Sequence, residues 1–395
     1  MKLMHLIFCA LALASCTAGA PLYLDVARSE MARCPEASFI DGQQGKLKWN
    51  YTTGLELQAL LDVARQSRPD RESLVGYVNV WYDAIIDSTG AIGGKYKESN
   101  YSLDHICPGF TLFDLCEYCP AEKYRKAMDN LYRQLQNQPR TPEGGFWHKK
   151  IYPGQMWLDG LFMAQPFYAR YTLEFVPDSL RAANYADIVH QFSLIYEHCY
   201  DPATGLLRHA WDSSHEMFWC NPSTGQSAHA WGRALGWYCM ALVDVIDVMG
   251  RETSVETGKD SLEHILLDVF EALKNNADPA TGLWYQVLDC PGREGNYLEA
   301  TCNAMFSYSF SKAVNLGIFP DAQYAGQLYE KVIETFVTRG PDGLVDMVQC
   351  CEVAGLGGKD NRSGDYDYYI HERVRANDPK GIGPLIRASI EYEKL

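Results

Sequence analysis

An aspartate at position 159 stands in an unusually apolar part of this chain. Between Ile151 and Tyr171 it is flanked by Met, Trp, Leu and Phe side chains. A carboxylate in apolar surroundings costs free energy as an anion unless it is hydrogen-bonded or paired, and desolvation raises its pKa. Asp159 is therefore a candidate general acid, a group that holds a proton near neutral pH and donates it. The alternative is a buried aspartate that caps a helix, and this segment alone does not separate the two.

Three further clusters of polar and aromatic residues could act together with Asp159. They are Asp104 in a loop before a Pro-Gly pair, His209 with Trp211, and Arg233 with Trp237, which lie four residues apart on one helix face. Each has a structural alternative: Asp104 could bind backbone amides, His209 could be a satisfied core histidine, and Arg233 could brace two helices through a cation–π contact. The conjunction of two carboxylates, a histidine, an arginine and aromatic rings favours an active site.

A turn sequence recurs along the chain and indicates how these clusters are positioned. Asp-Pro-Ala-Thr-Gly-Leu occurs at 201–206 and again at 278–283, and degenerate versions occur elsewhere. Pro, Asp and Gly at these spacings are typical of turns, and several copies continue into a short extended segment. The turn glycines are 54 to 77 residues apart, at Gly90, Gly144, Gly205, Gly282 and Gly343. The chain therefore repeats one structural unit about every sixty residues.

Segments with helical periodicity fill the intervals between these turns. They predict helices over 55–65, 74–86, 121–136, 182–196, 232–249, 262–275, 300–316, 324–336 and 383–392. Each interval accommodates one outgoing and one returning helix, which gives about six helical hairpins. Closed into a ring, they form an all-α (α/α)6 barrel with its turns and extended segments gathered at one end. No linker divides the chain, so residues 21–395 are predicted to form one catalytic domain.

Composition restricts the partners and the cofactors. A formal net charge of −15 argues against nucleic acid or an anionic membrane as the main partner. Apart from Cys9 and Cys16, eleven cysteines remain, an odd number that leaves at least one free thiol in an export compartment. The pair Cys116 and Cys119 has no partner pair, and most cysteines are interpreted as small buried hydrophobes. We predict no metal and no other cofactor.

Residues 1–20 have the features of an export signal. Lys2 is followed by an apolar stretch from Leu3 to Ala14 that is too short to span a bilayer as a mature helix. Leu13-Ala-Ser-Cys16 resembles a bacterial lipobox, with cleavage before Cys16 and a lipid anchor on that cysteine. A competing small-x-small site ends at Ala20. We therefore expect an exported protein of a bacterium, either periplasmic or anchored to the outer membrane as a lipoprotein.

Six motifs, in a fixed order from about residue 49 to the C-terminus, link the chain to a known family. They are Trp49-Asn-Tyr51-x-x-Gly54, Asp104-His-x-x-Pro-Gly109, Gln155-Met-Trp-Leu-Asp159-Gly160, His209-x-Trp-Asp212, Trp231-Gly-Arg233-Ala-x-Gly-Trp237-Tyr238 and Asn377-Asp-Pro-Lys-Gly381-Ile-Gly-Pro. With these motifs the chain resembles the unsaturated rhamnogalacturonyl hydrolases of glycoside hydrolase family 105, and more distantly the unsaturated glucuronyl hydrolases of family 88. The family fold is an (α/α)6 barrel.

The resemblance implies a hydration reaction. The substrate would be an oligosaccharide whose non-reducing end is a 4,5-unsaturated uronic acid left by a polysaccharide lyase. An acid protonates C4 and water adds at C5, which gives a hemiketal that opens and expels the neighbouring sugar. By this resemblance Asp159 is the acid and then the base that activates water. Asp104 would hold the substrate and keep Asp159 protonated by like-charge repulsion.

The same resemblance places Tyr51, His209, Arg233 and Trp237 at substrate contacts. We also predict Trp211, which belongs to one of the matching motifs, as a substrate-binding residue. Arg233 or a nearby lysine would offset the substrate carboxylate. Three alternatives stay open: an inverting glycosidase with Asp104 and Asp159 roughly 6.5–9.5 Å apart, a polysaccharide lyase, and a surface glycan-binding lipoprotein. The sequence leaves open the linked sugar, the parent uronate, the disulfide pairing and the oligomeric state.

Overall fold

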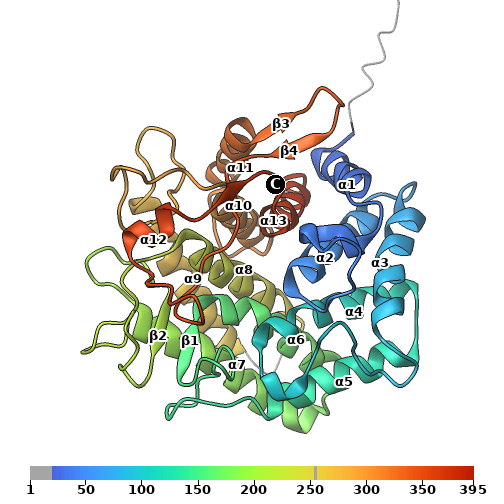
Figure 1. Cartoon of the computed structure of the whole chain (residues 1–395), viewed down its shortest axis with the longest axis horizontal. Helices are drawn as coiled ribbons and strands as arrows, with labels where there is room; N and C mark the ends of the chain where they lie inside the picture. Colours follow the sequence, from blue (N-terminus) through green and yellow to red (C-terminus); the bar gives the residue numbers. More distant parts are fainter. Residues whose placement is uncertain (1–19, 253–255) are drawn as a thin grey trace, which may run out of the picture.

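Two concentric rings of helices make up most of the molecule. The computed structural model describes residues 20–252 and 256–395, so Cys16 and nearly all of the predicted signal lie outside the described residues. The inner ring closes because each of its helices packs on the next and α13 packs on α2 (Figure 1). The inner helices are α2 (Tyr51–Gln66), α4 (Cys107–Tyr118), α6 (Leu158–Phe175), α8 (Gly232–Met249), α10 (Ala300–Asn315) and α13 (Pro379–Tyr392).

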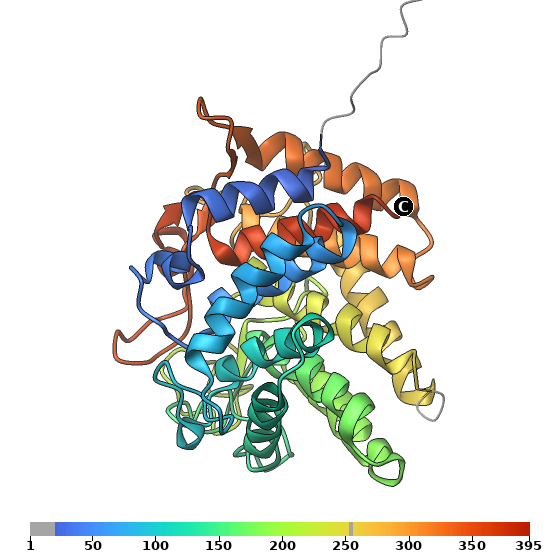
Figure 2. The same cartoon turned by 90° about the vertical axis from the view of Figure 1, so that its right-hand side faces the viewer.

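The outer ring supplies one antiparallel partner for each inner helix. α3, α5, α7, α9 and α11 pack on the inner helices that precede them, and α1 packs on α13, beside which it lies in both Figure 1 and Figure 2. The bounds are α1 (Leu22–Arg33), α3 (Arg71–Ile85), α5 (Glu122–Gln136), α7 (Asp178–Cys199), α9 (Glu256–Asn275) and α11 (Ala322–Phe336). The predicted all-α (α/α)6 barrel is confirmed.

Nine of these helices match the segments predicted from periodicity, and α1, α4 and α6 were not among those segments. The reason is clearest for α6, in which nearly every side chain from Leu158 to Ala169 is buried. A helix that is apolar on all sides has no amphipathic period to detect. It also contains Pro166 in its interior, a residue that ordinarily argues against a helix.

The turn repeat has the backbone conformation that its glycines suggest. The five turn glycines all have positive φ, between +73° at Gly205 and +92° at Gly144, a region in which side chains other than that of glycine are strained. These turns follow the outer helices and precede the loops that lead into the inner helices. Each predicted repeat of about sixty residues therefore contains one connection from an outer helix to an inner helix.

The end of the barrel at which the inner helices begin is the front mouth. Its loops are joined to one another by backbone hydrogen bonds, such as Leu103 N–H to His148 O at 3.0 Å and Leu158 N–H to His209 O at 3.1 Å. Short antiparallel ribbons add to it: β1 (Gln155–Trp157) with β2 (Ala210–Asp212), and β5 (Cys350–Cys351) with β6 (Val374–Arg375). β3 (Val337–Arg339) pairs with β4 (Val345–Met347), and a short helix α12 (Tyr366–Ile370) lies in the last long loop.

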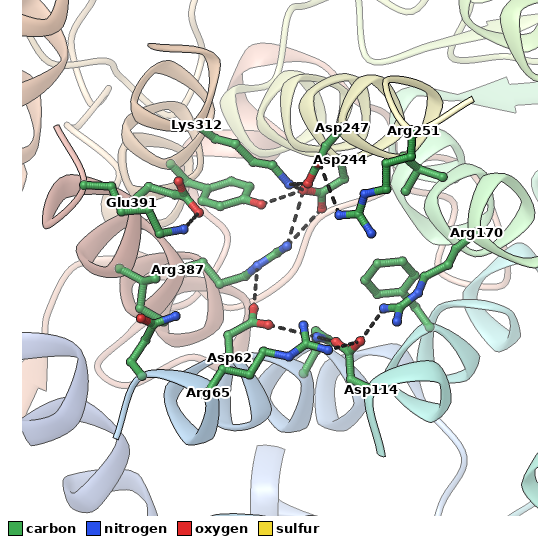
Figure 3. Close-up of a pocket in the computed structure, with 17 residues that line it drawn as sticks. Asp62, Arg65, Asp114, Arg170, Asp244, Asp247, Arg251, Lys312, Arg387 and Glu391 are labelled. Atoms are coloured by element: carbon green, nitrogen blue, oxygen red, sulfur yellow. Dashed lines mark hydrogen bonds and ion pairs between the residues drawn. The ribbon is translucent and has the colours of Figure 1, made fainter. Parts of the chain in front are cut away.

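At the opposite, rear end the inner helices finish in a set of paired charges that we call the rear charge belt. Figure 3 shows its members converging on a cavity of about 200 Å³. Arg387 contacts both Asp62 and Asp244, and Lys312 lies 2.7 Å from Asp244. The belt consists of Asp62, Arg65, Asp114, Arg170, Asp244, Asp247, Lys312 and Arg387, and all six inner helices contribute to it.

Apolar side chains fill the barrel lumen between its two ends. Leu55, Phe110, Phe162, Met163 and Phe167 surround a void of only about 20 Å³ there, which we call the apolar waist. The eleven cysteines in the described part of the chain are all unpaired thiols. Burial raises the pKa of several of them, for example Cys199 and Cys239, in line with their interpretation as small hydrophobes. Within the described residues, no helix combines the length and the apolar character that crossing a bilayer requires.

Candidate active site

Asp159 lies in the first turn of α6, directly after β1. Because β1 pairs with β2, the residue that precedes β2, His209, is brought beside it. Nε2 of His209 lies 3.1 Å from Oδ2 of Asp159. Apart from this contact, neither atom has a hydrogen-bond partner in the described structure. The two side chains therefore lie close enough to interact as charges, and each of the two atoms can still form a hydrogen bond with a ligand.

The protonation of Asp159 differs from the sequence-based expectation. Burial does raise the pKa of its carboxyl group, but the neighbouring His209 and His148 rings lower it by more, and the resulting pKa lies below the usual value for aspartate. Asp104 is not among the groups that move it most. The expectation of a raised pKa is therefore wrong, because it left out the imidazoles that pack against this carboxylate. The repulsion between Asp104 and Asp159 stays a prediction.

Asp104 lies in a short 3-10 helix, Leu103–His105, just before α4. The Nζ group of Lys149 forms a close ion pair with its Oδ2, and Nε2 of His148 lies 3.4 Å from its Oδ1. Burial raises the pKa of Asp104, but Lys149 and His148 lower it by a larger amount. The pKa therefore lies below the usual value for aspartate, and the residue is an anion at neutral pH. The positive charge of Lys149 offsets the negative charge of Asp104.

His148 lies between the two carboxylates and was not predicted as a site residue. It is buried, and burial lowers its pKa to about 4 despite the opposing influence of Asp104. A Cβ at Gly160 would approach its Nδ1 to 3.1 Å, so the glycine that follows Asp159 leaves the room that this ring occupies. The His148 ring, with its lowered pKa, is therefore held against the start of α6.

The turn repeat contained a signal for His148. This residue follows the turn glycine Gly144 by four positions, as His209 follows Gly205. The equivalent residue after Gly282 is Gln286, which is also fully buried. Equivalent positions of the repeat thus supply three polar side chains to the front mouth, and comparing the copies would have identified His148.

Tyr51 and Trp237 join the group from α2 and α8. The ring of Trp237 lies edge-on to that of Tyr51, with centroids 6.3 Å apart, and packs on Phe162 at 4.6 Å. Burial raises the pKa of Tyr51 well above its usual value; Asp104 and Asp159 raise it further and Arg233 opposes them. Tyr51 is therefore a neutral phenol within electrostatic range of both carboxylates, and its role as a substrate contact stays a prediction.

Arg233 lies deeper than its predicted role requires. It is 1% exposed, and its Nη2 group donates to Thr301 Oγ1 at 3.2 Å, to Glu299 Oε1 at 3.4 Å and to the Cys351 carbonyl. Its cation–π partner is Trp231 and not Trp237. Its Nε group has no hydrogen-bond partner in the described structure.

Trp211 is the predicted site residue that the structure does not bring into the group. Its indole stacks on His198 of α7, with ring centroids 3.7 Å apart and planes at 7°. It therefore packs against the outer ring, and its backbone, within β2, holds the ribbon that positions His209.

Three side chains of metal-ligating type gather near the mouth: His229, Asp289 and Cys290. Arg208 lies 3.0 Å from Oδ2 of Asp289, and the backbone N–H of Ala230 donates to Oδ1. The carboxylate is thus engaged by a cation and by a backbone donor, which fits poorly with metal ligation.

Comparisons with known proteins agree with this geometry. The family model described as Glycosyl Hydrolase Family 88 matches residues 23–395. A glycoside hydrolase from family 105 of C. acetobutylicum ATCC 824 is 40% identical, with a TM-score of 0.87, over 94% of this chain and 99% of that one.

More distant or shorter matches extend the comparison. An unsaturated glucuronyl hydrolase from Bacillus sp. GL1 has a TM-score of 0.63 at 10% identity over 94% of this chain and 95% of its own, and shares the fold. Protein Atu3128 of Agrobacterium fabrum is 36% identical over 213 residues, 52% of this chain and 89% of that protein. The chain is an enzyme, a glycosidase that belongs to the glycosyl hydrolase family 88 and 105 group.

Proposed function

We propose that this enzyme hydrates the 4,5 double bond of an unsaturated uronic acid at the non-reducing end of an oligosaccharide produced by a lyase. The observation that carries the proposal is the asymmetry between the two carboxylates. Asp104 is already paired with Lys149, whereas Oδ2 of Asp159 lacks a hydrogen-bond partner in the described structure and lies beside an imidazole. A reaction in which a single carboxylate serves first as acid and then as base fits this arrangement.

In the proposed reaction Asp159 donates its proton to C4, and the electron pair of the double bond forms the new C–H bond. Positive charge then develops at C5 and is shared with the ring oxygen. Water adds at C5 and gives its proton to the Asp159 carboxylate, which restores the acid. The hemiketal formed in this way opens, and the neighbouring sugar leaves.

The anionic character of Asp159 in the unliganded protein must be reversed before this step. A bound uronate brings a second negative charge and displaces water, and both effects raise the pKa of a nearby carboxyl group. His209 is the neighbour that can supply the proton, since its Nε2 lies 3.1 Å from Oδ2. Proton donation is thereby coupled to the presence of the substrate.

The remaining site residues have roles in binding. Tyr51 offers its half-buried ring to the sugar, and the buried Trp237 supports it edge-on. Lys149 orients Asp104 toward the hydroxyl groups of the sugar, and Arg233 lies beneath the mouth as a buried positive charge. We propose a rhamnogalacturonan-derived disaccharide as the substrate and pectin breakdown as the setting. We also propose export, with Cys16 as the lipid anchor.

The test is the loss of ultraviolet absorbance of the conjugated double bond when the purified enzyme meets an unsaturated rhamnogalacturonan disaccharide. The Asp159→Asn variant should lose activity by about 10²–10⁴-fold, the usual contribution of a general acid–base residue. Unchanged thermal unfolding would exclude misfolding as the reason.

Two other results would change the assignment. Turnover of a glucuronate-derived unsaturated disaccharide alone would correct the substrate and keep the reaction. Cleavage of saturated oligosaccharides without any loss of absorbance would replace the proposed reaction by that of an inverting glycosidase.

A further inference from the structure

A tyrosine from the last long loop reaches the back of the Asp159–His209 pair. Tyr369 lies on α12, and its hydroxyl is 2.7 Å from Nδ1 of His209, the ring nitrogen that faces away from Asp159. Both side chains are fully buried. Asp159, His209 and Tyr369 thus form a continuous line of three ionisable groups, of which sequence analysis identified the first two.

Two anchors fix α12 over the mouth. The side chain of Asp365 caps its first turn by accepting the N–H of Tyr368 at 2.8 Å. The hydroxyl of Tyr366 donates to the carbonyl groups of Arg293 and Glu294 at 3.1 and 2.9 Å. The position of Tyr369 is therefore set by contacts that do not involve the catalytic carboxylates.

The rings around His209 leave it little freedom to turn. The indole of Trp231 lies 4.9 Å from it and stacks on Tyr369, and the indole of Trp157 meets it edge-on at 5.4 Å. Gln286 accepts the Trp231 indole N–H at 3.1 Å and donates to the backbone carbonyl of Tyr369 at 3.3 Å. Gln286 thus ties together the two residues that confine the imidazole.

We propose that Tyr369 is a positioning residue that accepts the Nδ1–H of His209 and so allows one proton to pass between Nε2 of His209 and Oδ2 of Asp159. When the proton is on His209, both ring nitrogens carry hydrogen and the carboxylate is an anion. When it is on Asp159, the Nε2–H bond has broken, an Oδ2–H bond has formed, and Nδ1–H still donates to the tyrosine oxygen. The net charge of the pair is zero in both states.

A hydroxyl group is suited to this position because it also serves the state in which the pair has lost its proton. In that state the neutral imidazole keeps its hydrogen on Nε2, toward the carboxylate, and Nδ1 accepts the hydrogen of the tyrosine hydroxyl. A phenylalanine would leave a buried N–H without an acceptor in the proton-bearing states. A buried donor without an acceptor next to a charge is costly. The states in which the pair carries the proton are therefore destabilised more than the state in which the pair has lost it.

Other ionisable groups also face Asp159, His209 and Tyr369, and their charges contribute to the electrostatic potential at these three residues. They come from several elements and are His148, Asp104, Lys149, Tyr51, Asp289, Arg362 and Tyr368. None of them forms a hydrogen bond with Nδ1 of His209 in the described structure, where the tyrosine hydroxyl occupies that position.

The test is Tyr369→Phe, which removes one oxygen atom. The proposal rests on the proposed function for its kinetic readout: the basic limb of the pH profile of kcat/KM should move to lower pH by about one unit, which corresponds to one lost hydrogen bond to a charged group. The matched control is Tyr124→Phe, which removes a buried hydroxyl that donates to Asn79 at 2.8 Å between α5 and α3 and should leave the profile in place. An unchanged basic limb in Tyr369→Phe, with wild-type activity present, overturns the proposal.

A second readout does not need the substrate. In ¹⁵N-histidine spectra assigned with His209→Gln, the neutral imidazole of His209 should be the Nε2–H tautomer in the wild type. Its tautomer or titration should change in Tyr369→Phe and remain unchanged in Tyr124→Phe. An Nδ1–H tautomer in the wild type at high pH overturns the proposal. An inactive wild type with the expected tautomer would instead refute the proposed function alone.

Discussion

The two ends of the barrel use ionisable side chains in opposite ways. At the rear, Asp244 is bound by Lys312, Arg387 and the hydroxyl of Tyr308, and Asp114 is bound by Arg65, Arg170 and Gln58. At the front, buried atoms of Asp159, His209, His148 and Arg233 have no hydrogen-bond partner in the described structure.

The difference supports the proposal that the rear end serves stability and the front end serves the reaction. A buried charge that is fully paired holds helices together, and removing one partner leaves the others uncompensated. A polar atom left unpaired lowers stability and is retained where a ligand completes its bonding. The polar cavity of about 200 Å³ at the rear is therefore less informative about the reaction than the front mouth.

The strongest test of this contrast is Asp244→Ala at the rear. It leaves Lys312 and Arg387 buried without their shared carboxylate, so we expect the free energy of unfolding to fall by about 3–5 kcal/mol. Urea unfolding followed by circular dichroism measures this. A loss below about 1 kcal/mol would show that water replaces the carboxylate and that the belt does not join the helices.

Acid should weaken the rear end through the same residue. Burial raises the pKa of Asp244, but Arg387 and Lys312 lower it to about 2, below the ordinary value of 3.8. A lowered folded pKa stabilises the protein above the unfolded pKa, and this contribution disappears as the pH falls from about 4 toward 2. The shift of about two units corresponds to about 2 kcal/mol.

The measurement is the difference in unfolding free energy between the wild type and Asp244→Asn at several pH values from 5 to 2. The difference should shrink by about 2 kcal/mol over this range. A difference that stays constant would contradict the assignment of this acid sensitivity to Asp244.

At the front, Lys149→Gln should affect catalysis more than stability. The lysine is 24% exposed and offsets the charge of Asp104, so its loss frees that carboxylate to move and to repel an anionic substrate. We expect kcat/KM to fall by about tenfold, the effect of one lost charged hydrogen bond. Steady-state kinetics with a parallel thermal unfolding scan separates this outcome from a loss of stability of similar size.

The smallest effect is expected for Lys394→Ala, a partly exposed residue at the edge of the rear cavity that pairs with Glu391. An i,i+3 pair in contact with solvent contributes about 0.2–0.5 kcal/mol, so unfolding and activity should both stay near wild type. A larger loss would extend the belt to the surface of the rear end and weaken its distinction from ordinary surface charge.

The periodic parts of this molecule could be predicted from the sequence, and the parts that depend on tertiary contacts could not. The turn glycines indicated the repeat, because a left-handed turn leaves a local sequence signature, as at Gly205 and Gly282. The repeat in turn predicted the barrel. Asp159 and His209 were predicted from their motifs, and in the structure Nε2 of His209 lies 3.1 Å from Oδ2 of Asp159.

The pKa of Asp159 illustrates what escaped the sequence. Its direction depends on His148, which is eleven residues earlier, and on His209, which is fifty residues later. Tyr369 is a further 160 residues away from His209 and belongs to no periodic segment. Trp211 was expected among the substrate contacts on the basis of its motif, whereas its ring packs on an outer helix through a contact that no local pattern encodes.

The apolar waist has a consequence for traffic through the barrel. Because Phe110, Phe162 and Phe167 surround a void of only about 20 Å³, the lumen offers no passage for a sugar between the two ends of the barrel. A substrate that binds among the front loops therefore has to arrive at that end, and its products have to leave there as well.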